Sequence, residues 1–165
     1  RVAALCKAFG MHVVGTKRRP TAVANVEAVF VPGELRAHLP SADFVVLAAP
    51  HTPETVGLLG PAEVAALKPT AYLINVGRGS TVDQAALVDA LTSRRLAGAY
   101  LDAFTEEPLP DDHPFWDLDN VLLNPHDSHS SPHIGDRMVD LFCVNLGRYA
   151  AGLPLDHVCD PARGY

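Results

Sequence analysis

The sequence predicts an α/β protein built on a doubly wound, mostly parallel sheet. Short, unbroken apolar runs recur along the chain at residues 12–16, 43–48, 71–76, 97–101 and 121–123. Continuous rather than alternating hydrophobicity is typical of strands that are covered on both faces. Helical segments fall between most of these runs, so strand and helix alternate. In folds of this class, ligands bind beyond the carboxyl ends of the strands.

The expected helices follow from apolar spacing and from helix start signals. Val2, Leu5 and Phe9 share one side of a helix at the beginning of the chain. Pro61 is suited to the first turn of a helix that continues to residue 67. Asp83 can cap a further helix that runs to residue 93.

The last part of the chain has a different character. Residues 105–118 are rich in proline and in acidic residues and are expected to form a loop. A last helix over residues 134–151 carries apolar side chains around much of its circumference, which predicts packing against more than one element. Residues 154–165 are expected to form an extended tail.

The composition is that of an ordinary globular domain, with 48% apolar and 19% charged residues among 165. The net charge of -6 disfavours general binding to nucleic acid or to an anionic membrane. The longest apolar stretch, residues 44–50, falls far short of the roughly 18 residues that a membrane-spanning helix needs. Cys6, Cys143 and Cys159 are odd in number and far apart, which argues against disulfides and a cysteine-rich zinc site. We therefore expect a soluble, cytoplasmic protein.

Arg78 is a candidate anchor for an acidic ligand. It follows one of the expected strands and lies between Gly77 and Gly79, which permit a tight turn and a close approach of a ligand to the backbone. Its planar guanidinium can hold a carboxylate through two parallel hydrogen bonds. A surface arginine in a glycine turn is the alternative interpretation.

His126 follows another expected strand and is a candidate proton donor or acceptor. Histidine is suited to this task because its side chain exchanges a proton near neutrality. Glu107 is a plausible partner, since a nearby carboxylate favours the imidazolium form. The alternative for Glu107 is a solvated acid beside Glu106.

A metal site is a rival interpretation of the same region. His126, His129 and His133 lie close in the sequence to Asp127, and histidine and aspartate are common metal ligands. We disfavour it because Pro132 prevents a single regular helix through the segment and no H-E-x-x-H pattern is present.

Four motifs occur in a fixed order: APHTPET at 49–55, INVGRG at 74–79, LDAFTEEP at 101–108 and NVLLNPH at 120–126. Together they resemble the D-isomer-specific 2-hydroxyacid dehydrogenases, a family that includes phosphoglycerate, glyoxylate and hydroxypyruvate reductases. The resemblance implies a Rossmann-like fold and hydride transfer between NAD(P)H and a small 2-oxo or 2-hydroxy acid. It also implies a homodimer.

The resemblance implies roles for individual residues. Arg78 would bind the carboxylate and keto oxygen of the 2-oxo acid, His126 would transfer the proton at that oxygen, and Glu107 would orient and charge His126. Asp102 would contact the carboxamide of the nicotinamide. The other cofactor-binding positions would be Lys17, Arg18, Pro50, Thr55, Val76 and Gly77, together with Arg78 and His126.

The cofactor is expected to be NADP rather than NAD. Members specific for NAD carry an acid after the strand that here ends near Thr16, whereas this chain has Lys17 and Arg18. Cations attract a 2′-phosphate that a carboxylate would repel. Glu107 argues against the formate dehydrogenase branch, in which glutamine replaces this acid. After His126 the chain departs from the family's small or apolar residues with the polar segment 127–131.

The resemblance covers nearly the whole chain but lacks the family's dinucleotide fingerprint. The one G-x-G is at 77–79 and has Val82 at the third glycine position. We expect the first strand and its glycine-rich turn to precede Arg1, with residues 1–133 as an incomplete dinucleotide domain. Residues 134–165 would pack toward a separate substrate domain, and the chain alone would have negligible activity. A dinucleotide-sensing corepressor of the same fold is the alternative function.

Overall fold

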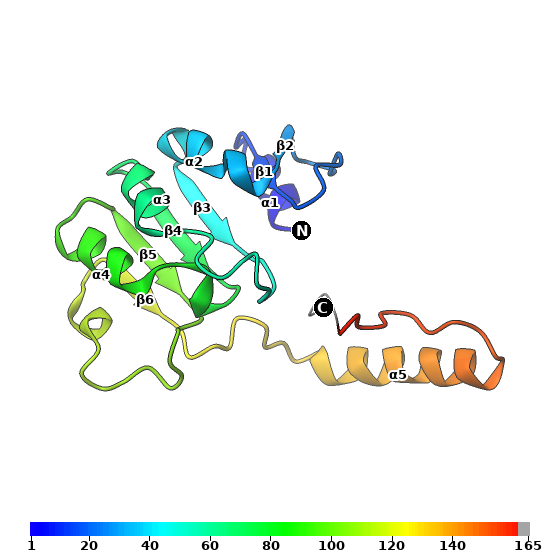
Figure 1. Ribbon diagram of the computed structural model, residues 1–165. Helices are drawn as coiled ribbons and strands as arrows, with labels where there is room; N and C mark the ends of the chain where they lie inside the picture. The colour runs from blue at the N-terminus through cyan, green and yellow to red at the C-terminus, as the bar shows by residue number, and fades with distance from the viewer. Residues whose placement is uncertain (162–165) are drawn as a thin grey trace.

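A computed structural model describes residues 1–161 of the chain. Its helices and strands alternate along most of the sequence, as Figure 1 shows. The strands are β1 (Val14–Thr16), β2 (Ala28–Phe30), β3 (Phe44–Leu47), β4 (Tyr72–Asn75), β5 (Gly98–Leu101) and β6 (Val121–Leu123). The helices are α1 (Val2–Ala8), α2 (Leu35–His38), α3 (Pro61–Ala66), α4 (Gln84–Thr92) and α5 (Ile134–Ala150). Four short 3-10 turns cover Pro32–Glu34, Leu39–Ser41, Gly79–Thr81 and Pro114–Asp117.

All strand pairs in the described residues are parallel, which confirms the predicted fold class. One sheet has the order β3-β4-β5-β6, and β1 pairs with β2 in a second, smaller sheet. The larger sheet is in register at its carboxyl edge, where Leu47, Asn75, Leu101 and Leu123 are neighbours. The loops that follow these four strands therefore begin side by side at this edge.

Each of the five predicted strands contains an observed one, while β2 and α2 were not predicted. The predicted loop at 105–118 is also partly ordered, because Pro114–Asp117 forms a 3-10 turn. Asp83 caps α4 as predicted, since its carboxylate accepts a hydrogen bond of 2.8 Å from the Ala86 N–H.

The hydrophobic core lies between the larger sheet and helices α3 and α4. Leu73 in β4 and Leu87 and Leu91 in α4 are fully buried, and Phe115 from the 3-10 turn is 1% exposed. Burial of side chains of this size contributes about 1.5–3 kcal/mol each. The core thus anchors the strands whose ends carry the candidate site.

Helix α5 is not packed in this core. None of its residues is buried, and Met138, Phe142 and Tyr149 are 67%, 67% and 74% exposed. Figure 1 shows the helix extending away from the sheet, with the tail returning along it. Within residues 1–161 the predicted packing against several elements is therefore not found. Residues 162–165 of the predicted tail lie outside the described residues.

The two sheets present free strand edges to a common cleft. Val14 and Thr16 of β1 and Phe44 and Val46 of β3 all line it, and Phe44 is 54% exposed. Between residues 1 and 161 no helix combines the length and apolarity required to cross a membrane.

Candidate functional site

The backbone around Arg78 is held by the buried end of β4. The Asn75 side chain is fully buried; its amide donates to the Arg78 carbonyl at 3.0 Å and its oxygen accepts from the Gly77 N–H at 3.0 Å. Thr81, also fully buried, donates its hydroxyl hydrogen to the same Arg78 carbonyl at 2.6 Å. The turn supplies hydrogen-bond partners for both buried side chains, so their burial has little energetic cost. The same hydrogen bonds fix the conformation of the turn.

Gly79 allows this turn to touch the loop that follows β5. A Cβ atom at this position would lie 1.9 Å from the carbonyl carbon of Phe104 and 2.3 Å from the Thr105 nitrogen. These are backbone atoms, so they cannot move aside without displacing the loop. Only glycine fits at this position, because the two backbones lie so close together. Gly79 therefore allows the Arg78 turn to pack against the segment that carries Glu107.

Glu107 connects that loop to His126. One carboxylate oxygen accepts the Phe104 N–H at 2.8 Å, and the other lies 2.7 Å from His126 Nδ1. Burial raises the pKa of Glu107, but the hydrogen bonds from Phe104 and His126 and the charges of His126 and Arg78 outweigh it. The net result is a pKa below the ordinary value, so the carboxylate is ionised at neutral pH.

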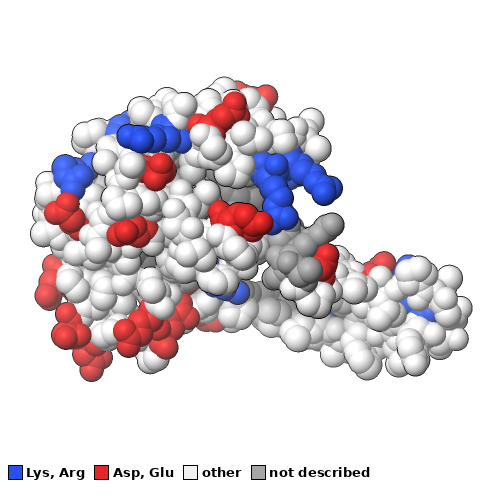
Figure 2. All heavy atoms as spheres, in the orientation of Figure 1, with Lys and Arg blue, Asp and Glu red and all other residues white. Residues whose placement is uncertain are grey.

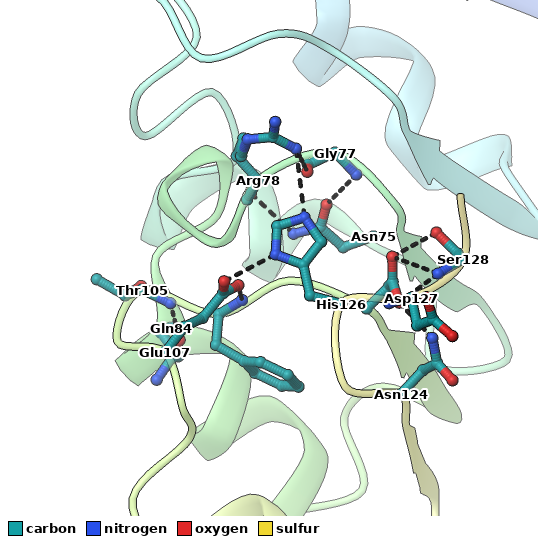
Figure 3. Close-up of polar contacts among 12 residues, drawn as sticks. Asn75, Gly77, Arg78, Gln84, Thr105, Glu107, Asn124, His126, Asp127 and Ser128 are labelled. Atoms are coloured by element: carbon teal, nitrogen blue, oxygen red, sulfur yellow. Dashed lines mark hydrogen bonds and ion pairs between the residues drawn. The ribbon is translucent and has the colours of Figure 1, made fainter. Parts of the chain in front are cut away.

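The partners of His126 indicate which of its ring nitrogens carries a proton. An ionised Glu107 can only accept a hydrogen bond, so His126 Nδ1 carries a proton. The other nitrogen, Nε2, lies 3.5 Å from Arg78 Nη1 (Figure 3). Arg78 Nη1 also donates to the Gly77 carbonyl at 2.8 Å, which holds the guanidinium near the histidine. The three predicted catalytic residues are therefore brought together, with Nε2 directed toward the arginine.

Asp102 lies at the end of β5 and is 2% exposed. It accepts hydrogen bonds from the Asn124 side chain, the Asp127 and Ser128 N–H groups and the Ser128 hydroxyl. Burial raises the pKa of Asp102, but the hydrogen bonds from Ser128, Asn124 and the backbone outweigh it and hold the pKa below the ordinary value.

Several residues of this network were not singled out from the sequence. Asn75, Asn124 and Ser128 support the turns, but they received no role. The one available signal was their position, because Asn75 and Asn124 stand at the ends of apolar runs just before the turn residues.

The remaining predicted cofactor positions divide between two places. Lys17, Arg18, Pro50 and Thr55 line the cleft between the two sheets, which has a volume of about 1070 Å³. Gly77 adjoins it, since a Cβ at this position would lie 3.0 Å from the carbonyl oxygen of Ala49, which lines the cleft. Val76, Asp102 and His126 lie at the same sheet edge but outside the lining of the cleft.

The cleft has a basic rim. Lys17 donates to the Thr21 hydroxyl at 3.1 Å, and Arg18 forms an ion pair of 3.3 Å with Glu54 in the loop after β3. Figure 2 shows a group of basic side chains beside acidic ones at a hollow in this part of the surface. The Arg18 to Glu54 contact joins the loops after β1 and β3, so the carboxyl ends of both strands lie at one side of the cleft.

The residues of the rival metal interpretation do not converge. Among residues 1–161 no group of three or more His, Cys, Asp or Glu side chains is placed to hold a metal ion. His126 instead directs its Nδ1 to Glu107.

A parallel α/β fold whose candidate site residues follow the carboxyl ends of the strands is typical of dinucleotide-binding domains. The model for the NAD binding domain of D-isomer specific 2-hydroxyacid dehydrogenases matches residues 1–128. The chain therefore belongs to the D-isomer specific 2-hydroxyacid dehydrogenase family, as the four sequence motifs indicated.

Relatives with solved structures or curated names support this assignment. The chain is 40% identical over 153 residues to a glyoxylate reductase of Thermococcus gammatolerans, a match that covers 92% of this chain and 45% of that protein. A crystal structure of a family member from Xanthobacter autotrophicus Py2, in complex with NADPH and MES, matches with a TM-score of 0.90 at 40% identity. That match covers 99% of this chain and 66% of the other.

A second solved structure is an NADPH-dependent glyoxylate/hydroxypyruvate reductase from Sinorhizobium meliloti, in complex with NADP and sulfate. It matches with a TM-score of 0.88 at 34% identity, over 99% of this chain and 52% of that chain. The chain spans about half the length of the curated relatives it matches.

The close approach at Gly79 predicts a strong effect of one methyl group. Gly79→Ala should lower the free energy of unfolding by roughly 1–3 kcal/mol or more, because the new Cβ overlaps the Phe104 backbone. Gly135→Ala in α5 is the matched control, since its Cβ would have no atom within 4 Å. Urea denaturation of both variants tests the contact, and equal effects would contradict it.

The lowered pKa of Glu107 predicts a dependence of stability on pH. A pKa below the ordinary 4.5 gives stability that is present above pH 4.5 and is lost as the pH falls through the folded-state pKa. Glu107→Gln should therefore cost up to about 1 kcal/mol at about pH 7, a small value because the pair is partly exposed, and less at about pH 3.

Urea denaturation of the parent and the variant at both pH values measures this difference. Glu106→Gln, at the exposed neighbouring position, is the control and should show no such dependence. A cost of Glu107→Gln that is the same at both pH values would argue against the ion pair with His126.

Proposed function

We propose that the complete protein reduces 2-oxo acids to D-2-hydroxy acids with a nicotinamide dinucleotide, using Arg78, Glu107 and His126. One observation carries the proposal. His126 has Nδ1 2.7 Å from the Glu107 carboxylate and Nε2 3.5 Å from the Arg78 guanidinium. An acid that binds the guanidinium is thereby placed beside a nitrogen that can donate a proton. The names of relatives, among them glyoxylate reductases, support the same chemistry.

Each residue has a distinct task in this proposal. Arg78 binds the substrate carboxylate and the neighbouring keto oxygen through its paired N–H donors. His126 donates the proton from Nε2 to the keto oxygen as the C=O bond becomes a C–O–H group. Glu107 stabilises the imidazolium by its negative charge and keeps Nδ1 protonated. The reduced nicotinamide, when bound, supplies the hydride to the keto carbon.

The residues around the cleft fit a dinucleotide. Lys17 and Arg18 supply positive charge at the rim beside the carboxyl ends of β1 and β3, where a phosphate group can bind. We assign them to the 2′-phosphate of NADPH and place Pro50, Thr55, Val76 and Gly77 along the nucleotide. The NADPH and NADP complexes of the two neighbouring structures support a preference for NADP over NAD.

The proposal extends to the substrate, the assembly and the domain boundary. Glyoxylate and hydroxypyruvate are the substrates that the names of relatives indicate. We place the dinucleotide domain at residues 1–133 and propose that residues 134–165 pack toward a substrate domain. The exposed apolar side chains of α5 support a packing role for this segment. A homodimer in the cytoplasm completes the proposal.

The central experiment is turnover by the complete gene product. With glyoxylate or hydroxypyruvate and NADPH, His126→Gln should lower kcat by about 100-fold to 10,000-fold, the usual range for a lost general acid. Arg78→Ala should lower kcat/KM by about 100-fold or more, because charge-assisted hydrogen bonds contribute about 1.5–3 kcal/mol each. Arg78→Lys keeps the charge but not the paired donors, so its kcat/KM should fall between those of Arg78→Ala and the parent protein.

Matched controls lie elsewhere on the surface. Arg94→Ala removes an arginine that pairs with Asp119, and His12→Gln removes a histidine that is 73% exposed. Both should keep the parent kcat and KM. Unchanged rates in Arg78→Ala and His126→Gln would refute the mechanism. A parent protein that binds dinucleotide without turnover would instead support the corepressor-like role.

The basic rim predicts opposite effects of two substitutions on cofactor binding by the complete gene product. Arg18→Ala should weaken NADPH binding by about tenfold, because a charged hydrogen bond to the 2′-phosphate is lost, and should leave NADH binding unchanged. Glu54→Gln should strengthen NADPH binding a few-fold, because Glu54 competes with phosphate for Arg18.

Calorimetric titration with each nucleotide measures both effects. Arg94→Ala again serves as the control. Equal losses of NADPH and NADH affinity in Arg18→Ala would show that Arg18 does not select the phosphate, and a strong NADH preference of the parent would refute the NADP assignment.

A further inference from the structure

The turn that carries His126 has an unusual backbone. His126 has a φ of 55°, in the left-handed region that residues other than glycine seldom adopt, and its N–H donates to the Asn124 carbonyl at 2.9 Å. Such a conformation is strained and persists only where the surroundings hold it. Because this backbone sets the direction of the Cα–Cβ bond, the groups that hold the turn help Glu107 to place the His126 ring.

The groups that hold the turn converge on one buried carboxylate. Asp102 accepts the Asp127 N–H at 2.9 Å and the Ser128 N–H at 3.1 Å, immediately after His126 in the chain. The Ser128 hydroxyl donates to its other oxygen, and the Asn124 amide approaches from the residue before Pro125. Donors on both sides of His126 are thus tied to the end of β5.

Ser128 adds a contact that a small apolar residue would lack. Its N–H bond to Asp102 is available to any residue with an N–H group, whereas its hydroxyl bond needs serine or threonine. Hydrogen bonds to a charged group contribute more than neutral ones, and a buried carboxylate that loses one is left partly unsatisfied. The serine therefore tightens the turn on the side where the chain continues toward α5. Figure 3 shows Ser128, Asp127 and Asn124 grouped beside the His126 turn.

We propose that Ser128 is a positioning residue for His126, which acts through Asp102 by locking the left-handed turn that carries the histidine. Its hydroxyl donates to one oxygen of a carboxylate that is 2% exposed and whose other oxygen accepts the Asp127 N–H. This inference rests on the proposed role of His126 as proton donor.

The inference predicts a selective kinetic defect in the complete gene product. Ser128→Ala should lower kcat by about tenfold, because small misplacements of a catalytic group have effects of this size. The KM of the 2-oxo acid should change by less than about twofold, since Arg78 is untouched. Ser128→Thr, which keeps the hydroxyl, should restore the parent values.

Ser130→Ala is the matched control, at an exposed serine two residues further along the chain, and should match the parent protein. Unchanged kcat in Ser128→Ala, with His126→Gln inactive, would overturn the positioning role and leave the proposed function standing. Parallel changes of kcat, KM and unfolding temperature would likewise overturn it in favour of a general structural role. Full activity of His126→Gln would overturn both.

Discussion

The in-register pairing of the parallel strands β3 to β6 is the constraint on which the candidate site depends. Leu47, Asn75, Leu101 and Leu123 are neighbours at the carboxyl edge, so loops from distant parts of the chain begin side by side. Arg78 and His126 are 48 residues apart in the sequence, yet their side chains meet at 3.5 Å. A slip of one residue in a strand would move its end by about 3.3 Å and turn its side chains to the opposite face. The geometry of the three residues would be lost.

Buried polar groups at the strand ends fix the conformation of the turns that follow the strands. Asn75 and Thr81 fasten the Arg78 turn, and Asp102 fastens the turn after His126. All three are at most 2% exposed, and each is satisfied by hydrogen bonds to the backbone of a turn. Removal of such a partner leaves a buried group with a desolvation penalty of about 1–3 kcal/mol, so these turns resist displacement. The candidate site side chains can remain partly exposed, as His126 and Glu107 are at 35% and 36%, because buried polar groups hold the turns that carry them.

Two surfaces of the described chain remain uncovered, one beside the basic rim and one on the helix that extends away from the sheet (Figure 1). The facing edges of β1 and β3 line the cleft whose rim carries Arg18, and α5 presents exposed apolar side chains. Free strand edges and large apolar patches are typical of surfaces that bind another part of a protein. Residues 127–133 connect the His126 turn directly to α5.

The sequence by itself identified five strands by their unbroken apolar runs, the capped helix α4, the family and the candidate residues Arg78, Glu107 and His126. These features rest on local signals, namely continuous hydrophobicity, a capping residue and motifs in order. Helix α2 escaped prediction because four residues are too short to show a periodic pattern. Strand β2 lies in the apolar run 28–31, which was not predicted as a strand, and its pairing with β1 identifies it as one. Only the tertiary structure decided that Glu107 meets Nδ1, that Gly79 contacts the Phe104 backbone and that Ser128 binds Asp102. Those contacts join residues 19 to 26 positions apart, and such distances are set by how strands pair and loops pack rather than by neighbouring residues.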